Sequence, residues 1–267
     1  MADKSFEVSL GISDVVKEVK DTETVKEADK TTALLVRAIH AALSPLEKWV
    51  MQKEYNLAET KKLLEEKLKD TPVEKIITPP SYVAVPVIQS ISYCMDDPIL
   101  RDMYAELLAH AMNSDTVDNV HPTYVEIIKQ MSPYDAVVFK ELCGQVLIPC
   151  IDVSCINKRT RVSCLINEYV MFTDFAKHPL VPTQISLENL ERLRLIEAHN
   201  STSSNNQRYK QLKSAIQDKV DEYIETNKES MPKGEYEVTY REYVFKIRAF
   251  GQFFARACMG IDFSNVE

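Results

Sequence analysis

The chain has 267 residues, with 32 Lys and Arg against 40 Asp and Glu, and a formal net charge of −8. Its 45% hydrophobic and 27% charged residues are typical of a globular protein and exclude general disorder. The acidic balance disfavours a dedicated duplex-binding protein. No apolar run approaches the roughly 20 residues of a membrane-spanning helix, and the first residues lack the pattern of a signal peptide. We therefore expect a cytoplasmic protein without a transmembrane segment.

The cysteines and glycines limit the cofactor chemistry that is open to the chain. Six cysteines occur, at positions 94, 143, 150, 155, 164 and 258, and without an export signal we expect them to be reduced thiols. No CxxC pair is present, so the spacing typical of zinc ribbons is missing. The five glycines lie too far apart to form a phosphate-binding loop. We therefore expect no cofactor.

The N-terminal part begins with a polar, charged stretch, residues 1–30, which we expect to be a flexible arm. Residues 31–43 are apolar apart from Arg37 and His40, which share one helical stripe. A membrane-surface helix would carry more Lys and Arg. The pattern therefore favours a buried helix with one solvent-exposed edge.

Between residues 44 and 133 the same helix-starting signal recurs. A residue that can cap a helix comes directly before proline, which suits the first helical position because its missing N–H needs no partner there. The five sites are Ser44-Pro45, Thr71-Pro72, Asp97-Pro98, His121-Pro122 and Ser132-Pro133. From residue 98 to 112 apolar side chains also repeat every three or four positions. We therefore predict an all-helical domain over residues 31–131.

After Gly144 the pattern changes to one that favours strands. β-branched and aromatic residues are frequent near 146–172, with a turn predicted at Asn157, and alternation over 236–248 marks a further strand. Amphipathic spacing predicts a long helix over 207–224.

The C-terminal elements suggest a known arrangement. A helix over 186–194 runs into an extended end, and the strand over 236–248 leads into a last helix. Residues 132–264 therefore resemble a winged-helix module with a helical insertion. The predicted fold class is mainly α, with a helical N-terminal domain followed by this winged-helix-like α+β C-terminal domain.

Winged helices often bind DNA, so residues 186–256 are a candidate nucleic-acid surface. Its candidate contacts are Arg192, Arg194, Lys246 and Arg248. Residues 184–267, however, hold 12 Lys and Arg against 13 Asp and Glu, without the positive excess that phosphate binding needs. Nucleic acid is a possible partner that the charge does not favour.

One polar group stands out as a candidate functional patch. It comprises Glu106, His110, Asn113, His121 and Tyr124. Glu106 and His110 are four residues apart and share a helix face, and the turn after Asn113 could bring His121 near them. Such a set could bind zinc in a cryptic metal-dependent hydrolase. A surface pair and a capping histidine are the simpler explanation, since no metal-binding motif supports the set, and we expect no metal ligands and no catalytic residues.

Residues 96–136 carry a resemblance to a known family. The run DDPILRDMYAELLAHAMN, followed by VHPTYVEIIKQMSPYDA, is similar to the core signature of the Abi-alpha (abortive infection alpha) family of bacterial proteins. The looser similarity extends over residues 31–260. The resemblance implies a part in defence against phage and supplies no catalytic site. We therefore expect a non-enzymatic component that acts through contacts with another protein or with a second copy of itself.

Overall fold

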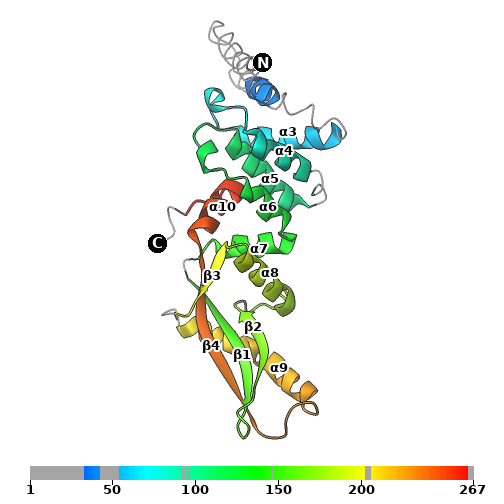
Figure 1. The fold of residues 1–267 in the computed structure, drawn as a ribbon, viewed down its shortest axis with the longest axis vertical. Coiled ribbons are helices and arrows are strands. Elements are labelled where there is room, and N and C mark those ends of the chain that lie inside the picture. The colour runs from blue at the N-terminus through cyan, green and yellow to red at the C-terminus, as the bar shows by residue number, and fades with distance from the viewer. Residues whose placement is uncertain are drawn as a thin grey trace. The chain divides into compact units, whose positions relative to one another are not determined.

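A computed structural model describes residues 33–42, 54–91, 94, 97–145, 147–201 and 206–263, and Figure 1 shows their ribbon. They form two compact units. The first unit is Met1–Pro133 with Phe253–Asp262, and the second is Tyr134–Gln252 with Phe263–Glu267. The flexible arm predicted for residues 1–30 lies outside the described residues.

The described part of the first unit is helical. Its elements are a helix over 33–42, α3 (Glu54–Leu68), η1 (Val73–Lys75), α4 (Ser81–Ile91), α5 (Pro98–Ala111), η2 (Val117–Asn119), α6 (Thr123–Lys129) and most of α10 (Ala249–Met259). Helix α5 packs against α3, α4 and α6, and most of its residues are buried. The Tyr124 ring of α6 meets the Phe254 ring of α10 edge to face, with centroids 5.5 Å apart.

The helix over 33–42 buries the apolar face that the sequence predicts. Leu35, Ala38 and Ile39 are buried, whereas Arg37 and His40 are exposed. The face formed by these side chains therefore packs inside the protein.

The proline signals mark helix starts by different means. Asp97 is the N-cap of α5, and its side chain accepts hydrogen bonds from the backbone N–H groups of Ile99 and Leu100, at 3.0 and 2.9 Å. Helix α7 begins directly at Pro133. Thr71-Pro72 precedes only the short 3-10 turn η1. Ser44-Pro45 lies outside the described residues.

A four-stranded antiparallel sheet forms the centre of the second unit. Its elements are α7 (Pro133–Leu142), β1 (Ile148–Asn157), β2 (Ser163–Val170), α8 (Leu180–Arg192), β3 (Ile196–His199), α9 (Asn206–Asn227), β4 (Tyr236–Ile247) and the start of α10. The strand order is β2-β1-β4-β3. Asn157 makes the β1–β2 turn, where its side-chain oxygen accepts from the N–H groups of Arg159 and Thr160.

Helix α9 covers one face of this sheet (Figure 1). The apolar positions predicted over 207–224, which include Tyr209, Leu212 and Ile216, form a buried cluster with Ile151 and Val153 of β1. Lys213 of α9 also pairs with Glu242 of β4, at 2.6 Å. The apolar face of α9 is therefore part of the core.

The predicted fold class is wrong: the described residues form a mixed α/β protein, and their sheet is not that of a winged helix. A wing is a short hairpin attached to helices, whereas β1 and β4 here have 10 and 12 residues and form the middle of the sheet. The strand that the sequence suggests as the wing, over 236–248, is β4, which pairs with β1 on one side and with the edge strand β3 on the other. The long strands bury apolar side chains against α9, and this packing makes the sheet the core of the unit.

Candidate functional site

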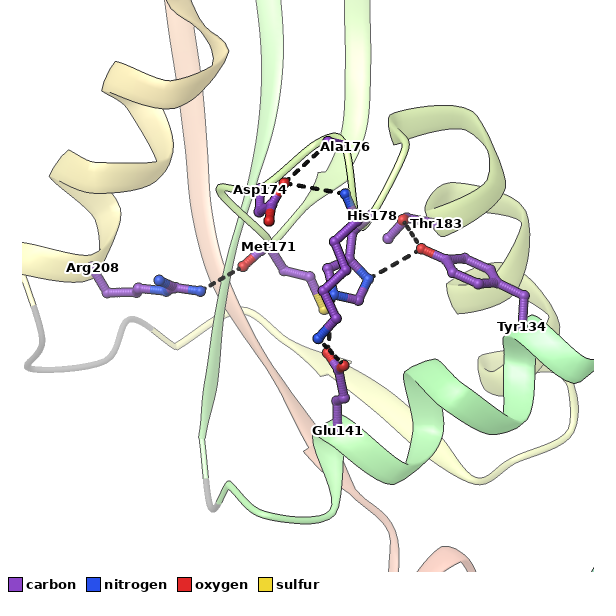
Figure 2. A network of polar contacts seen from close by, with 9 residues as sticks. Tyr134, Glu141, Met171, Asp174, Ala176, His178, Thr183 and Arg208 are labelled. Atoms are coloured by element: carbon purple, nitrogen blue, oxygen red, sulfur yellow. Dashed lines mark hydrogen bonds and ion pairs between the residues drawn. The ribbon is translucent and has the colours of Figure 1, made fainter. Parts of the chain in front are cut away.

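A network of polar contacts in the second unit surrounds His178 (Figure 2). We define the His178 network as Tyr134, Glu141, Lys177, His178 and Thr183. Tyr134 and Glu141 stand seven residues apart on α7, two turns on the same helix face. Thr183 belongs to the first turn of α8, and the other two residues come from the loop between β2 and α8.

The loop that carries His178 is shaped by its own hydrogen bonds. The Asp174 side chain accepts from the N–H groups of Ala176 and Lys177, both at 3.1 Å, and its carbonyl accepts from the N–H of His178 at 2.8 Å. The Phe172 ring stacks on the imidazole, with centroids 3.9 Å apart and planes 17° apart. Arg208 of α9 donates to the carbonyl of Met171 at 3.1 Å, which fixes the start of the loop.

Both ring nitrogens of His178 have partners. Its Nε2 lies 3.1 Å from Glu141 Oε2, and its Nδ1 lies 3.2 Å from the Tyr134 hydroxyl. That hydroxyl is 2.8 Å from Thr183 Oγ1, and Lys177 donates to Glu141 at 2.6 Å. All the bonds are satisfied together when Nε2–H donates to Glu141, Tyr134 donates to Nδ1 and Thr183 donates to Tyr134.

This arrangement can fix elements in place and can move a proton along its hydrogen bonds. The His178 side chain is only 5% exposed, whereas Glu141 is 30% exposed. A buried imidazole between a carboxylate and a phenol resembles the polar chains that orient a base in enzymes. Here the chain ends at Thr183, which is also buried. The observed contacts therefore connect α7, the β2–α8 loop and α8.

A second polar cluster lies on the sheet at Asp152. Its carboxylate accepts from the Tyr243 hydroxyl at 2.8 Å and from the N–H of Tyr169 at 3.1 Å, and Arg241 lies 3.5 Å away. Tyr169 has a left-handed backbone, with φ of 57°. Burial, followed by the neighbouring Cys150 and Asp152, raises the pKa of Tyr243. Burial, followed by nearby carboxylates, raises the pKa of Tyr169 to about 12.

These raised pKa values predict loss of stability in alkali. An unfolded tyrosine ionises near pH 10, whereas Tyr243 and Tyr169 stay neutral in the folded protein until higher pH. Their contribution is complete below pH ~10 and is lost as pH rises towards the folded pKa values. We expect the melting temperature to fall between pH 10 and 11.5, with a shallower fall in a Tyr243→Phe variant. A melting temperature that stays level over this range would contradict the prediction; tyrosinate absorbance at 295 nm tracks the ionisation.

The structure pairs Glu106 and His110 of the patch predicted from the sequence. His110 Nδ1 lies 3.5 Å from the Glu106 carboxylate and 3.1 Å from the Glu106 carbonyl oxygen. Glu106 also binds Lys67 of α3 at 2.7 Å, and Lys67 binds Asp102 at the same distance. Burial lowers the pKa of Lys67, but the hydrogen bonds to Asp102 and Glu106 outweigh that effect and leave it raised. Glu106 therefore helps to hold α3 against α5.

The other three members of the patch have separate structural contacts. The Asn113 side chain accepts from the N–H of Asp115 in the turn after α5. His121 Nδ1 accepts from the N–H of Thr123 at 3.2 Å, but the N-cap of α6 is Pro122, without a side-chain capping bond. Tyr124 is buried against Phe254. Within the residues that the structure describes, no three His, Cys, Asp or Glu side chains form a group that could hold a metal ion.

Three of the four candidate nucleic-acid contacts lie beside an acidic or polar side chain. Arg248 binds Glu197 at 2.6 Å, and Lys246 stands opposite Glu197 in the β3–β4 register. Arg192 donates from Nε and Nη2 to the side chain of Asn189. Arg194 is exposed, with a left-handed backbone. A carboxylate beside two of these four cations reduces the positive potential of this surface.

The sequence gives little indication of the His178 network. Tyr134 and His178 are 44 residues apart, and Tyr134 and Thr183 are 49 apart, so no motif spacing joins them. Only the hydrogen-bonding turn at Asp174 is local enough to be read from the sequence.

Comparison with known proteins identifies the family. A sequence profile for abortive infection alpha matches residues 52–258, which is most of the chain. The chain belongs to this family, and the resemblance seen at residues 96–136 is confirmed. No curated protein and no solved structure matches the chain. In the described part of the chain, no helix is both long enough and apolar enough to cross a bilayer.

Proposed function

We propose that this protein is a cytoplasmic component of bacterial abortive infection, the defence in which an infected cell stops growing or dies before it releases phage. We propose further that it acts without an enzymatic step, through contacts with another protein or with a second copy of itself. The observation that carries the first part is the family match over residues 52–258.

The second part of the proposal rests on what the polar side chains do. Glu106 binds Lys67, His121 accepts from the N–H of Thr123 at the start of α6, and Asn113 shapes a turn. Each of these residues therefore has a structural role, and no catalytic role is needed to account for it. The net charge of −8 and the Arg248–Glu197 pair favour protein over nucleic acid as the partner.

Phage challenge of bacteria that express the protein tests the proposal. We expect protection of the culture at low multiplicity of infection, and at high multiplicity collapse of the culture with a low phage yield. Cells carrying the empty vector are the control. Unchanged phage yield across a broad panel, with the folded protein present, would contradict a role in defence.

Two sets of variants distinguish action through protein contacts from the two alternatives, metal-dependent hydrolysis and nucleic-acid binding. His110→Ala and His121→Ala remove the histidines that a metal-dependent hydrolase would need, and we expect both variants to protect fully. The double variant Arg192→Glu, Arg194→Glu reverses charge on exposed side chains, and we expect it to protect as well. If the folded histidine variants lose protection, the enzymatic alternative replaces our proposal; if the charge reversal does, nucleic-acid contact replaces it. The melting temperature of each variant shows that it is folded.

A further inference from the structure

Two cysteines face each other across the β1–β2 hairpin. Cys155 of β1 and Cys164 of β2 are directly opposite in the antiparallel register, which is regular from Ser154 to Ile156. Both are free thiols. Cys155 is fully buried, whereas Cys164 is partly exposed. We define these two residues as the Cys155–Cys164 pair.

The positions of the pair suit a disulfide. Residues directly opposite in an antiparallel ladder have Cα atoms about 4.5 to 5.5 Å apart and side chains on the same face of the sheet. A disulfide requires Cα atoms roughly 4.4 to 6.8 Å apart, a spacing that both kinds of opposed position have, and Cβ atoms about 3.5 to 4.5 Å apart, which directly opposed residues reach with a small local shift. The bond could therefore form without separation of the strands. Cys143, Cys150, Cys258 and Cys94 have no cysteine opposite them in the described sheet.

We propose that the Cys155–Cys164 pair is a redox site, which a peroxide oxidises to a disulfide within the hairpin. This inference does not depend on the proposed role in defence. The Cys164 thiolate attacks the O–O bond of hydrogen peroxide, which gives a sulfenic acid and, after protonation of the leaving hydroxide, water. The Cys155 sulfur then attacks the sulfenic sulfur, the S–S bond forms, and the hydroxyl leaves with the Cys155 proton as a second water. Two thiols lose two electrons and two protons, and one peroxide is reduced to two waters.

Exposure sets the order of these two steps. Peroxide reaches the partly exposed Cys164 first. Cys155 is buried opposite Val238 of β4, and Val238 packs against the core between the sheet and α9. Burial raises the pKa of Cys155, and the neighbouring Cys164 raises it further. Cys155 therefore stays protonated while peroxide oxidises Cys164, and it gives up its proton to the leaving hydroxyl only as it attacks the sulfenic sulfur beside it.

The disulfide would hold one edge strand of the sheet in place. Strand β2 is an edge strand that pairs only with β1 in the sheet. A covalent link to β1 closes the turn around Asn157 and prevents β2 from detaching. Oxidised protein should therefore melt at a temperature several degrees above that of reduced protein.

Mass spectrometry of the full-length protein tests the site. The protein is treated with hydrogen peroxide, its free thiols are alkylated in denaturant, and it is digested. Trypsin cleaves after Lys158, Arg159 and Arg161, between the two cysteines, and a protease that cleaves before Asp152 separates Cys155 from Cys150. We expect a disulfide-linked pair of peptides, residues 152–158 with 162–173, and alkylation of four of the six thiols. A reductant should reverse both results.

Cys94→Ser provides the matched control, because Cys94 is also partly exposed but has no opposite thiol. This variant should still form the link, whereas Cys164→Ser should not. Cys155→Ala should also fail to form the link, and it provides a second test should Cys164→Ser fold poorly. Alanine is chosen there because Cys155 is buried. Circular dichroism shows whether each variant is folded. Oxidation of Cys164 to sulfinic acid without the link, or a link only between two copies, would overturn the proposal.

Discussion

Replacement of Gly251 by Ala should destabilise the protein by about 3 kcal/mol, although alanine is the better helix former. Gly251 is buried in α10, where a Cβ atom would overlap the Leu195 carbonyl oxygen and lie 3.0 Å from its carbonyl carbon. That carbonyl cannot move freely, because it also accepts from the N–H of Arg248 at 3.0 Å. The helix-propensity gain of roughly 1 kcal/mol is therefore smaller than the cost of separating two backbones. Urea denaturation measures the loss.

Gly144→Ala is the matched control for this substitution. Among the described residues, a Cβ atom at Gly144, just after α7, would meet only the Glu141 carbonyl oxygen, at an ordinary 3.8 Å. Its φ is not in the left-handed region. We expect a change within about 0.5 kcal/mol. Equal effects of the two substitutions would mean that α10 does not approach Leu195 this closely.

Local signals in the sequence predict local structure in this protein. The Asp97-Pro98 start of α5 depends on residues within one helical turn, and the structure confirms it. The turn at Asn157 depends on a side chain that bonds to the next few backbone groups, and it too is observed. The apolar spacing of α9 likewise predicts which of its faces is buried. In each case the interactions that decide the structure lie within a few residues.

The fold class depends on contacts between distant residues, and there the prediction from sequence is wrong. Ile148 of β1 pairs with Phe245 of β4, 97 residues along the chain, and no periodicity within either strand shows this partner. The segments 186–194 and 236–248 have the same local pattern whether they form a wing or an open sheet. Only the pairing of β4 with both β1 and β3 distinguishes the two folds.

The candidate site residues show the same difference between local and long-range contacts. Glu106 and His110 are found together because a spacing of four places them on one helix face. Placing His121 with them requires the turn to fold back, whereas its ring nitrogen accepts from the N–H of Thr123. The partners of His178 come from α7 and α8, so only tertiary structure brings them together.

Replacement of His178 by Ala should cost about 3 kcal/mol of stability, the second large effect that we expect. The substitution removes a ring that stacks on Phe172 at 3.9 Å and leaves a cavity between α7 and the β2–α8 loop. It also removes the contacts to Tyr134 and Glu141. Glu141 still has Lys177, and Tyr134 still has Thr183, so most of the loss should come from packing rather than from unpaired polar groups.

His199→Ala isolates the effect of burial, because His199 also lies near a glutamate, Glu197, at 3.2 Å, but its side chain is 44% exposed. We expect this variant to stay within about 0.5 kcal/mol of the parent protein in the same urea titration. His178→Gln should fall between the two, since its amide can replace one hydrogen bond but not the stacked ring. If His178→Ala unfolds at the same urea concentration as His199→Ala, the His178 network does not stabilise the packing of α7, the β2–α8 loop and α8. The buried histidine would then need a different explanation, and loss of phage protection in that stable variant would indicate a direct functional role.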